Sequence, residues 1–224
     1  MPSGSPKALL FDIDGTLADT DALHLEAFNE VLGRYGHSFD HARFTRELQG
    51  FSNASIGERF LAGESPARQA AIIGEKEAAF RRLVAGKIQP VPGLMALLAR
   101  ADCAGIPMVA VTNAPRLNAE MLLSGLGIMD RFKALVIGDE LAQGKPHPMP
   151  YLEGLRVTGG VAAESVAFED SRSGVQSASA AGIVTIGMRT SLSHTDLVSA
   201  GAVTTAANFE DPELLKLVGK AMEW

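Results

Sequence analysis

The feature that most constrains the fold is a regular alternation of short apolar runs and longer helical stretches after residue 90. Short apolar runs bounded by turn residues are typical of buried strands, and the segments between them carry the spacing of amphipathic helices. This alternation predicts an α/β fold, a doubly wound parallel sheet with helices on both faces. Strands are expected over 108–112, 134–137, 165–168 and 184–186, and helices over 94–104, 116–125, 148–157 and 173–181, with only short elements after them.

One more strand is expected near the N-terminus, where a run of four apolar residues, 8–11, follows Lys7 and ends in Asp12-Ile13-Asp14-Gly15-Thr16. Side chains alternate along a strand, so Asp12 and Asp14 should lie on one side with Ile13 opposite. In parallel α/β sheets, ligands bind at the carboxyl ends of the strands, which is where this pair lies. The pair is therefore the first candidate for chemistry.

The closeness of Asp12 and Asp14 limits what they can do, because two neighbouring carboxylates repel unless a cation or a shared proton lies between them. Mg²⁺ suits such a site because it prefers hard oxygen ligands. An aspartate can also act as a nucleophile, and a second aspartate beside it can protonate the leaving group. The alternative is a polar turn without catalytic function, and the partners that later segments supply argue against it.

Polar residues also follow the later strands. Thr112 and Asn113 end the second strand, where a hydroxyl and a backbone amide can donate to a phosphate oxygen. Lys145 lies in a Gly-Lys-Pro-His-Pro motif over 144–148 and offers a compact cation for a nucleophile or a transferring phosphoryl group. Taken singly, Thr112 and Asn113 are equally typical of a helix N-terminus, and a lysine such as Lys145 is by default a surface residue.

Glu169 and Asp170 follow the strand over 165–168, within a Phe-Glu-Asp-Ser-x-x-Gly motif. Burying two adjacent acids is unfavourable unless they hold a metal, so they are candidate Mg²⁺ ligands. Together with the segments that begin at Asp12, Thr112 and Lys145, this motif completes a set that resembles, in order, the four motifs of the haloacid dehalogenase (HAD) superfamily of phosphohydrolases.

The resemblance implies a role for each matched residue. Asp12 matches the nucleophile that forms an aspartyl-phosphate, and Asp14 matches the general acid/base. Thr112 and Asn113 match the motif that holds the phosphate, and Lys145 matches the third motif. The metal is implied to be Mg²⁺, bound by Asp12, Asp14 through its backbone carbonyl, Glu169 and Asp170.

The segment 18–87 has a different character, because helical spacing runs through it without a convincing strand. Helices are expected over 21–35, 41–48, 54–61 and 66–85. We therefore expect a four-helix cap domain, 18–87, inserted into a core formed by 1–17 and 88–224. It resembles the helical cap of the HAD subgroup that includes β-phosphoglucomutase and small sugar-phosphate phosphatases.

Three further residues are candidates for substrate binding. His24 matches a cap histidine of that subgroup, although a histidine on a helix is more often an ordinary surface group. Asn53 closes the loop Gly50-Phe51-Ser52-Asn53, which resembles the subgroup's specificity loop. Arg116, just after the second motif, either reaches an anionic group of the substrate or is a solvated residue at a helix start.

Composition limits the partners. The formal net charge of −6 argues against a nucleic-acid surface, which needs a basic face. No apolar run is long enough to span a membrane, and the polar residues 1–6 do not resemble a signal peptide. Cys103 is the single cysteine, so no intrachain disulfide can form, which fits a cytoplasmic protein. Cys103 is expected to pack in the core, and the chain is expected to be a monomer.

The sequence thus predicts a Mg²⁺-dependent phosphatase for a small phosphorylated metabolite, a sugar phosphate. The alternative is a sugar-phosphate mutase, which needs a cation for a second phosphate. The β-phosphoglucomutase pattern has an arginine where Asn53 stands, so hydrolysis is favoured. Haloalkanoate dehalogenation needs neither Mg²⁺ nor a second aspartate, and phosphonate hydrolysis would predict a small residue at Asp14. A binding module on an inactive scaffold is disfavoured because every catalytic position holds the expected residue type.

Overall fold

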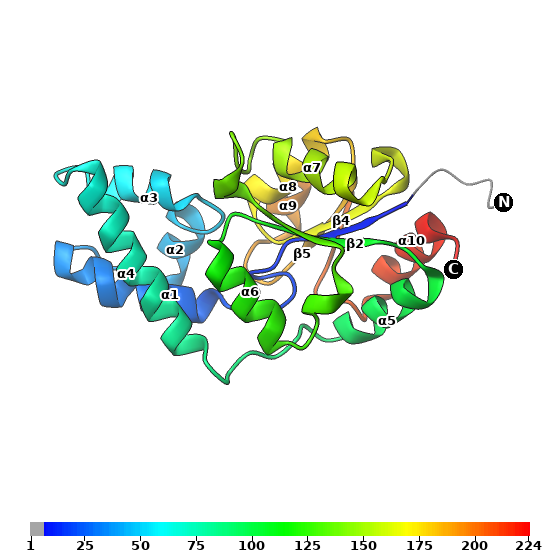
Figure 1. Cartoon of the computed structure of the whole chain (residues 1–224), viewed down its shortest axis with the longest axis horizontal. Coiled ribbons are helices and arrows are strands. Elements are labelled where there is room, and N and C mark those ends of the chain that lie inside the picture. Colours follow the sequence, from blue (N-terminus) through cyan, green and yellow to red (C-terminus); the bar gives the residue numbers. More distant parts are fainter. Residues whose placement is uncertain (1–6) are drawn as a thin grey trace.

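The computed structural model describes residues 7–224; the segment 1–6, for which no signal peptide is expected, lies outside the described residues. A six-stranded parallel sheet forms the core, in the order β3-β2-β1-β4-β5-β6 (Figure 1). Because the order reverses beside β1, the carboxyl end of β1 lies at the switch point where such sheets bind ligands. The strands are β1 (Leu9–Phe11), β2 (Met108–Thr112), β3 (Ala134–Ile137), β4 (Val166–Glu169), β5 (Val184–Met188) and β6 (Thr204–Ala206).

Helices cover both faces of the sheet, as the predicted doubly wound fold requires (Figure 1). Leu9 and Phe11 point into one buried cluster and Leu10 into the other, which is the alternation expected of a strand buried on both sides. One face is covered by α5 (Leu94–Ala104), α6 (Arg116–Gly125) and α10 (Pro212–Met222), and the other by α7 (Met149–Thr158), α8 (Arg172–Ala180) and α9 (His194–Ala200).

The C-terminal region contains the short elements that the sequence predicts, the helix α9 and the edge strand β6, and one longer element that it does not predict, the helix α10. The strand β6 is short and half-buried, so it carries no apolar run that would reveal it. Cys103 also differs from expectation, because it is exposed. The buried stripe of α5 runs through Leu94, Leu98 and Ala101, and Cys103 falls on its other side.

Four α-helices precede α5 in the chain: α1 (Asp21–Leu32), α2 (His41–Glu47), α3 (Asn53–Phe60) and α4 (Pro66–Val84). They lie together beyond the end of the sheet (Figure 1). Ser52 caps α3 by accepting from the backbone N–H of Ser55, so α3 begins one residue earlier than expected. Asn53 therefore lies in the first turn of this helix and not in the preceding loop.

The two connections between the sheet and these helices run side by side at the end of β1. Ala18 pairs with both Asp14 and Pro90, and the backbone N–H of Val91 donates to Leu17 at 2.9 Å. The division into a core of 1–17 and 88–224 and a cap of 18–87 stays a prediction, and these two connections would be its hinges.

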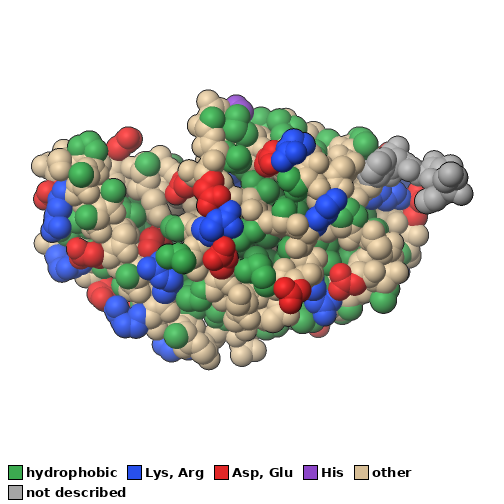
Figure 2. Space-filling model, in the orientation of Figure 1, with side chains coloured by type: hydrophobic (Ala, Val, Ile, Leu, Met, Phe, Trp, Pro, Cys, Tyr) green, Lys and Arg blue, Asp and Glu red, His purple; other side chains and the backbone are tan. Residues whose placement is uncertain are grey.

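Two surface properties bear on the expected partners. On the face that Figure 2 shows, acidic and basic side chains are interspersed, with no continuous basic area. Within residues 7–224, no helix combines the length and the apolar character that crossing a membrane requires.

Candidate active site

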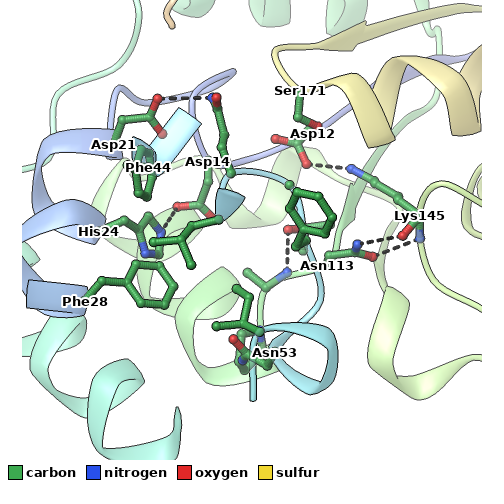
Figure 3. A pocket seen from close by; sticks show the side chains of 18 of the residues that line it. Asp12, Asp14, Asp21, His24, Phe28, Phe44, Asn53, Asn113, Lys145 and Ser171 are labelled. Atoms are coloured by element: carbon green, nitrogen blue, oxygen red, sulfur yellow. Dashed lines mark hydrogen bonds and ion pairs between the residues drawn. The ribbon is translucent and has the colours of Figure 1, made fainter. Parts of the chain in front are cut away.

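A pocket lies where the carboxyl ends of the central strands face the helices α1 to α4 (Figure 3). The segments that line it are far apart in the sequence and meet only through the fold. The core contributes Asp12, Asp14, Thr112, Asn113, Ala114, Pro115, Lys145, Asp170 and Ser171, and the helical segment contributes Asp21, His24, Phe28, Phe44, Leu48, Gln49, Gly50, Phe51, Asn53, Ile56, Lys76 and Glu77.

Lys145 links two buried carboxylates at the centre of the site. Its Nζ lies 2.6 Å from Oδ1 of Asp12 and 2.5 Å from Oε1 of Glu169, and it donates to the carbonyl of Val111 at 2.8 Å. The hydroxyl of Tyr151 donates to the same oxygen of Glu169 at 2.8 Å. Lys145 therefore uses all three of its donors and is held in one orientation against Asp12.

The electrostatics of this centre follow from burial and close charges. Burial favours the neutral form of Lys145, but Asp12 and Glu169 outweigh this effect and raise the pKa of its ammonium group. Burial raises the pKa of Asp12 well above its usual value; Lys145 opposes this shift and Glu169 adds to it. The cluster thus holds more negative charge than Lys145 neutralises, which a bound cation would relieve.

Asn113 orients Lys145 through the backbone. Its Oδ1 accepts from the backbone N–H of Lys145 at 3.1 Å, and its Nδ2 donates to the carbonyl of Lys145 at 3.2 Å (Figure 3). A Cβ added at Gly138 or Gly144 would overlap Asn113, so both glycines leave room for this amide. Asn113 lines the pocket as expected, but both functional ends of its side chain are engaged with Lys145.

Asp14 faces the first helix. Its Oδ1 accepts from the hydroxyl of Thr20 at 2.8 Å and lies 3.0 Å from Nε2 of His24. The ring of His24 stacks on Phe80 with centroids 3.7 Å apart, and its Nδ1 lies 3.0 Å from Nζ of Lys76. Because a lysine ammonium only donates, Nδ1 is the acceptor and Nε2 carries the proton that it donates to Asp14.

This network keeps Asp14 ionised. Burial alone would favour the neutral carboxyl, but His24 and Thr20 outweigh it and hold the pKa of Asp14 below its usual value. An ionised, oriented carboxylate can accept a proton from water, so the geometry suits a general base.

Asp170 lies on the other side of Asp12, at the end of β4. Burial and the carboxylates of Asp12 and Asp21 raise the pKa of Asp170 well above its usual value. Nε2 of Gln49 donates to Asp170 at 2.8 Å and to Asp21 at 3.1 Å. Asp21 also accepts a hydrogen bond from the hydroxyl of Ser191. Gln49, which follows α2, therefore ties the helical segment to the acidic end of the core.

Asp12, Glu169 and Asp170 can each place one carboxylate oxygen within 4.8 Å of the others, and all three are buried. Buried carboxylate oxygens are the ligands that Mg²⁺ prefers, so the donor set fits this ion. Glu169 differs from the other two because Lys145, Tyr151 and the Ser171 hydroxyl already donate to it. Since a carboxylate has about four acceptor positions, Glu169 has little capacity left for a metal.

Two glycines allow this close arrangement. Gly15 has a φ of +75°, and a Cβ there would overlap Asp170. A Cβ at Gly174 would overlap the Glu169 carboxylate, and the N–H of Gly174 donates to Ser171 at 3.1 Å to cap α8. The close approach of the backbone to these two carboxylates thus depends on residues without side chains at both positions.

The structure brings all but one of the expected side chains to the pocket or its buried floor. Arg116 is the exception: it does not line the pocket, and its guanidinium binds Glu140 at 2.7 Å and Glu120 at 3.3 Å on the surface. Of the two interpretations of Arg116, the structure therefore favours the solvated helix start. The pocket residues that the sequence does not predict include three with charged side chains and one with an amide: Asp21, Lys76, Glu77 and Gln49.

A family model for haloacid dehalogenase-like hydrolases matches residues 9–188, from β1 to the end of β5. The chain belongs to this family. The match spans the aspartate pair, Lys145 and the Glu169-Asp170 turn, so the HAD resemblance of the motifs is confirmed.

Individual relatives resemble this HAD-like chain in sequence and, where a structure is solved, in fold. Protein CbbY of Rhodobacter capsulatus is 35% identical over 187 residues, covering 79% of this chain and 82% of the relative. Fructose-1-phosphate phosphatase YqaB of Escherichia coli K12 is 31% identical over 182 residues, covering 81% of this chain and 95% of the relative. Among solved structures, a Rhodobacter sphaeroides CbbY variant in complex with xylulose-(1,5)bisphosphate superposes with a TM-score of 0.79. Its chain is 30% identical in sequence, and the superposition covers 91% of this chain and 95% of that one.

Proposed function

We propose that this HAD-like chain is a Mg²⁺-dependent phosphatase that hydrolyses a small phosphorylated metabolite, a sugar phosphate, through an aspartyl-phosphate on Asp12. The observation that carries the proposal is Asp12 itself, held by Lys145 within a buried acidic cluster at the floor of the pocket. A relative named as a fructose-1-phosphate phosphatase supports the substrate class.

In the proposed reaction, a carboxylate oxygen of Asp12 attacks phosphorus and the bond to the leaving oxygen breaks. Asp14, which is ionised in the free protein, first takes up a proton from solvent or keeps the one taken from water in the preceding turnover; it gives this proton to the leaving oxygen, and the alcohol departs. Water then attacks phosphorus and Asp14 takes the proton of the water, which releases inorganic phosphate and restores Asp12. Lys145 orients Asp12 in both steps and offsets charge on the phosphoryl oxygens.

The residues proposed to hold Mg²⁺ directly are Asp12 and Asp170, with the backbone carbonyl of Asp14. Glu169 acts through Lys145 and Ser171, because its acceptor positions are taken. Bound there, Mg²⁺ would supply positive charge against the phosphate and the carboxylates.

The mutase alternative lacks support at the pocket wall. Among residues 7–224, no arginine lines the pocket, and Asn53 lies where the mutase pattern has one. The four cap arginines that are candidates for this charge have partners elsewhere: Arg59 pairs with Glu47, Arg68 with Tyr35, Arg81 with Asn118 and Arg82 with Glu30. With β-glucose 1-phosphate, inorganic phosphate should therefore appear faster than glucose 6-phosphate, and the reverse order would favour the mutase.

Two substitutions test the proposed roles when hydrolysis of para-nitrophenyl phosphate is measured against Mg²⁺ concentration. Asp170→Ala removes a metal ligand, so its activity should recover partly at high Mg²⁺. Asp14→Ala removes the acid/base, so its turnover should stay low at every Mg²⁺ concentration. Equal losses that do not respond to Mg²⁺ in both variants would contradict this division, and a wild-type protein without activity would exclude the phosphatase.

A further inference from the structure

The pocket wall remote from Lys145 contains a buried carboxylate. Glu77 of α4 is 5% exposed and lines the same pocket as Asp12. Its Oε2 accepts from Nδ2 of Asn118 at 2.6 Å, and its Oε1 accepts from Lys76 at 3.2 Å. Asn53 hydrogen-bonds with it as well, and Figure 3 shows Asn53 across the pocket from Asp12 and Lys145. We call Asn53, Lys76 and Glu77 the distal wall.

Glu77 is ionised in this wall. Burial favours its neutral form, but Lys76, His24 and Asn53 outweigh burial and hold the pKa of Glu77 below its usual value. Asp139, in the turn after β3, is a second acid nearby, since burial and the charge of Glu77 raise the pKa of Asp139.

The one cation of the distal wall is already paired. Lys76 donates to Glu77 and to His24, and its Nζ lies 4.1 Å from the ring centroid of Phe28. Arg81 lies behind the wall: it donates to Oδ1 of Asn118 at 2.7 Å and does not line the pocket. The distal wall therefore offers no free positive charge to a ligand.

The charge of the whole pocket points the same way. Five carboxylates and two lysines line it, so the formal charge of the pocket, with all of these groups ionised, stays negative even with a divalent cation bound. Lys145 and the proposed metal offset the negative charge of the reacting phosphate. A second phosphate at the distal wall would meet Glu77 without a cation of its own, and like charges brought together in this way oppose binding.

We propose that Glu77 selects phosphate monoesters whose remote end is uncharged and carries hydroxyl groups, and that it rejects esters with a second phosphate. This inference rests on the proposed phosphatase function and names the substrate class of that site. A carboxylate has about four acceptor positions, and Lys76, Asn118 and Asn53 use three of those on Glu77. The fourth, with the carbonyl oxygen of the Asn53 amide, can accept from sugar or polyol hydroxyls.

Competition against para-nitrophenyl phosphate tests the inference without requiring that the competitor be turned over. Fructose 1-phosphate and fructose 1,6-bisphosphate differ by one phosphate, and their inhibition constants are measured with Mg²⁺. For the wild-type protein we expect the monophosphate to bind more tightly. In Glu77→Gln, which keeps the size of the side chain and removes its charge, this preference should fall by about tenfold, the order expected for one partly screened like-charge contact.

Two further variants separate charge from fold. Glu75→Gln makes the same charge change on the same helix, but Glu75 is exposed and pairs with Arg34, so the preference should not change. Asn53→Arg adds a cation to the distal wall and should tighten binding of the bisphosphate. Melting temperatures of all variants confirm that each is folded.

The outcomes are distinct. Without hydrolysis of para-nitrophenyl phosphate, the proposed function itself fails. With hydrolysis, the inference is overturned if the wild-type protein binds the bisphosphate as tightly as the monophosphate. It is also overturned if neither sugar phosphate competes, or if folded Glu77→Gln keeps the wild-type preference.

Discussion

Replacing Asp12 with asparagine is expected to lower kcat by at least about three orders of magnitude, the scale on which a nucleophilic residue acts. The amide keeps the shape of the side chain and can still accept from Lys145, but it cannot attack phosphorus. The effect should therefore appear in phosphate release from any ester and leave the melting temperature close to that of the wild-type protein.

A matched control for this change is Asp19→Asn. Asp19 is exposed and lies just before the first helix, so the substitution alters the net charge equally without touching the pocket. Its activity should equal that of the wild-type protein. If Asp12→Asn retains a tenth of the wild-type activity, the proposed nucleophile is wrong.

Lys145→Met is expected to damage both activity and stability. Lys145 is buried and bridges Asp12 and Glu169 as their shared ion-pair partner. Removing one member of a buried ion pair leaves uncompensated charge, which costs about 3–5 kcal/mol of the free energy of unfolding. Separately, loss of the cation beside the transferring phosphoryl group should lower kcat by ~100-fold or more.

Urea denaturation and phosphate release measure the two effects separately. The exposed Lys216 on α10 provides the control, since Lys216→Met should change the free energy of unfolding by no more than about 0.5 kcal/mol. Wild-type stability in Lys145→Met would show that the buried carboxylates do not depend on this ammonium group.

The sheet could be predicted from the sequence because local patterns determine it. Strands β1 to β5 carry apolar runs that are short and bounded by turn residues, and each lies within about two residues of its expected bounds. The polar residues that end β1, β2 and β4 could be assigned to one site because parallel strands bring their carboxyl ends to the same edge. By contrast, the sequence does not identify β6 as a strand, because this half-buried edge strand carries no apolar run.

The distal wall could not be predicted, because burial of its charged residues depends on distant packing. Glu75-Lys76-Glu77 has the pattern of a solvated helix face, yet the latter two are buried and only Glu75 is exposed. Lys76 is covered because its ammonium lies over Phe28 of α1, far away in the sequence. For the same reason, the surface ion pair of Arg116 could not be predicted: Arg116 follows β2, whereas its partner Glu140 follows β3.

The central claim, an aspartyl-phosphate on Asp12, is tested most directly by rapid mixing of Asp14→Ala with para-nitrophenyl phosphate and Mg²⁺. Nitrophenolate leaves without needing a proton, so Asp12 can still be phosphorylated, whereas water attack is slow without Asp14. The account predicts a burst of nitrophenolate stoichiometric with the enzyme and phosphate retained on the protein. The double variant that carries both Asp14→Ala and Asp12→Asn should show no burst. Linear release from the first turnover, with no phosphate on the protein, would contradict it.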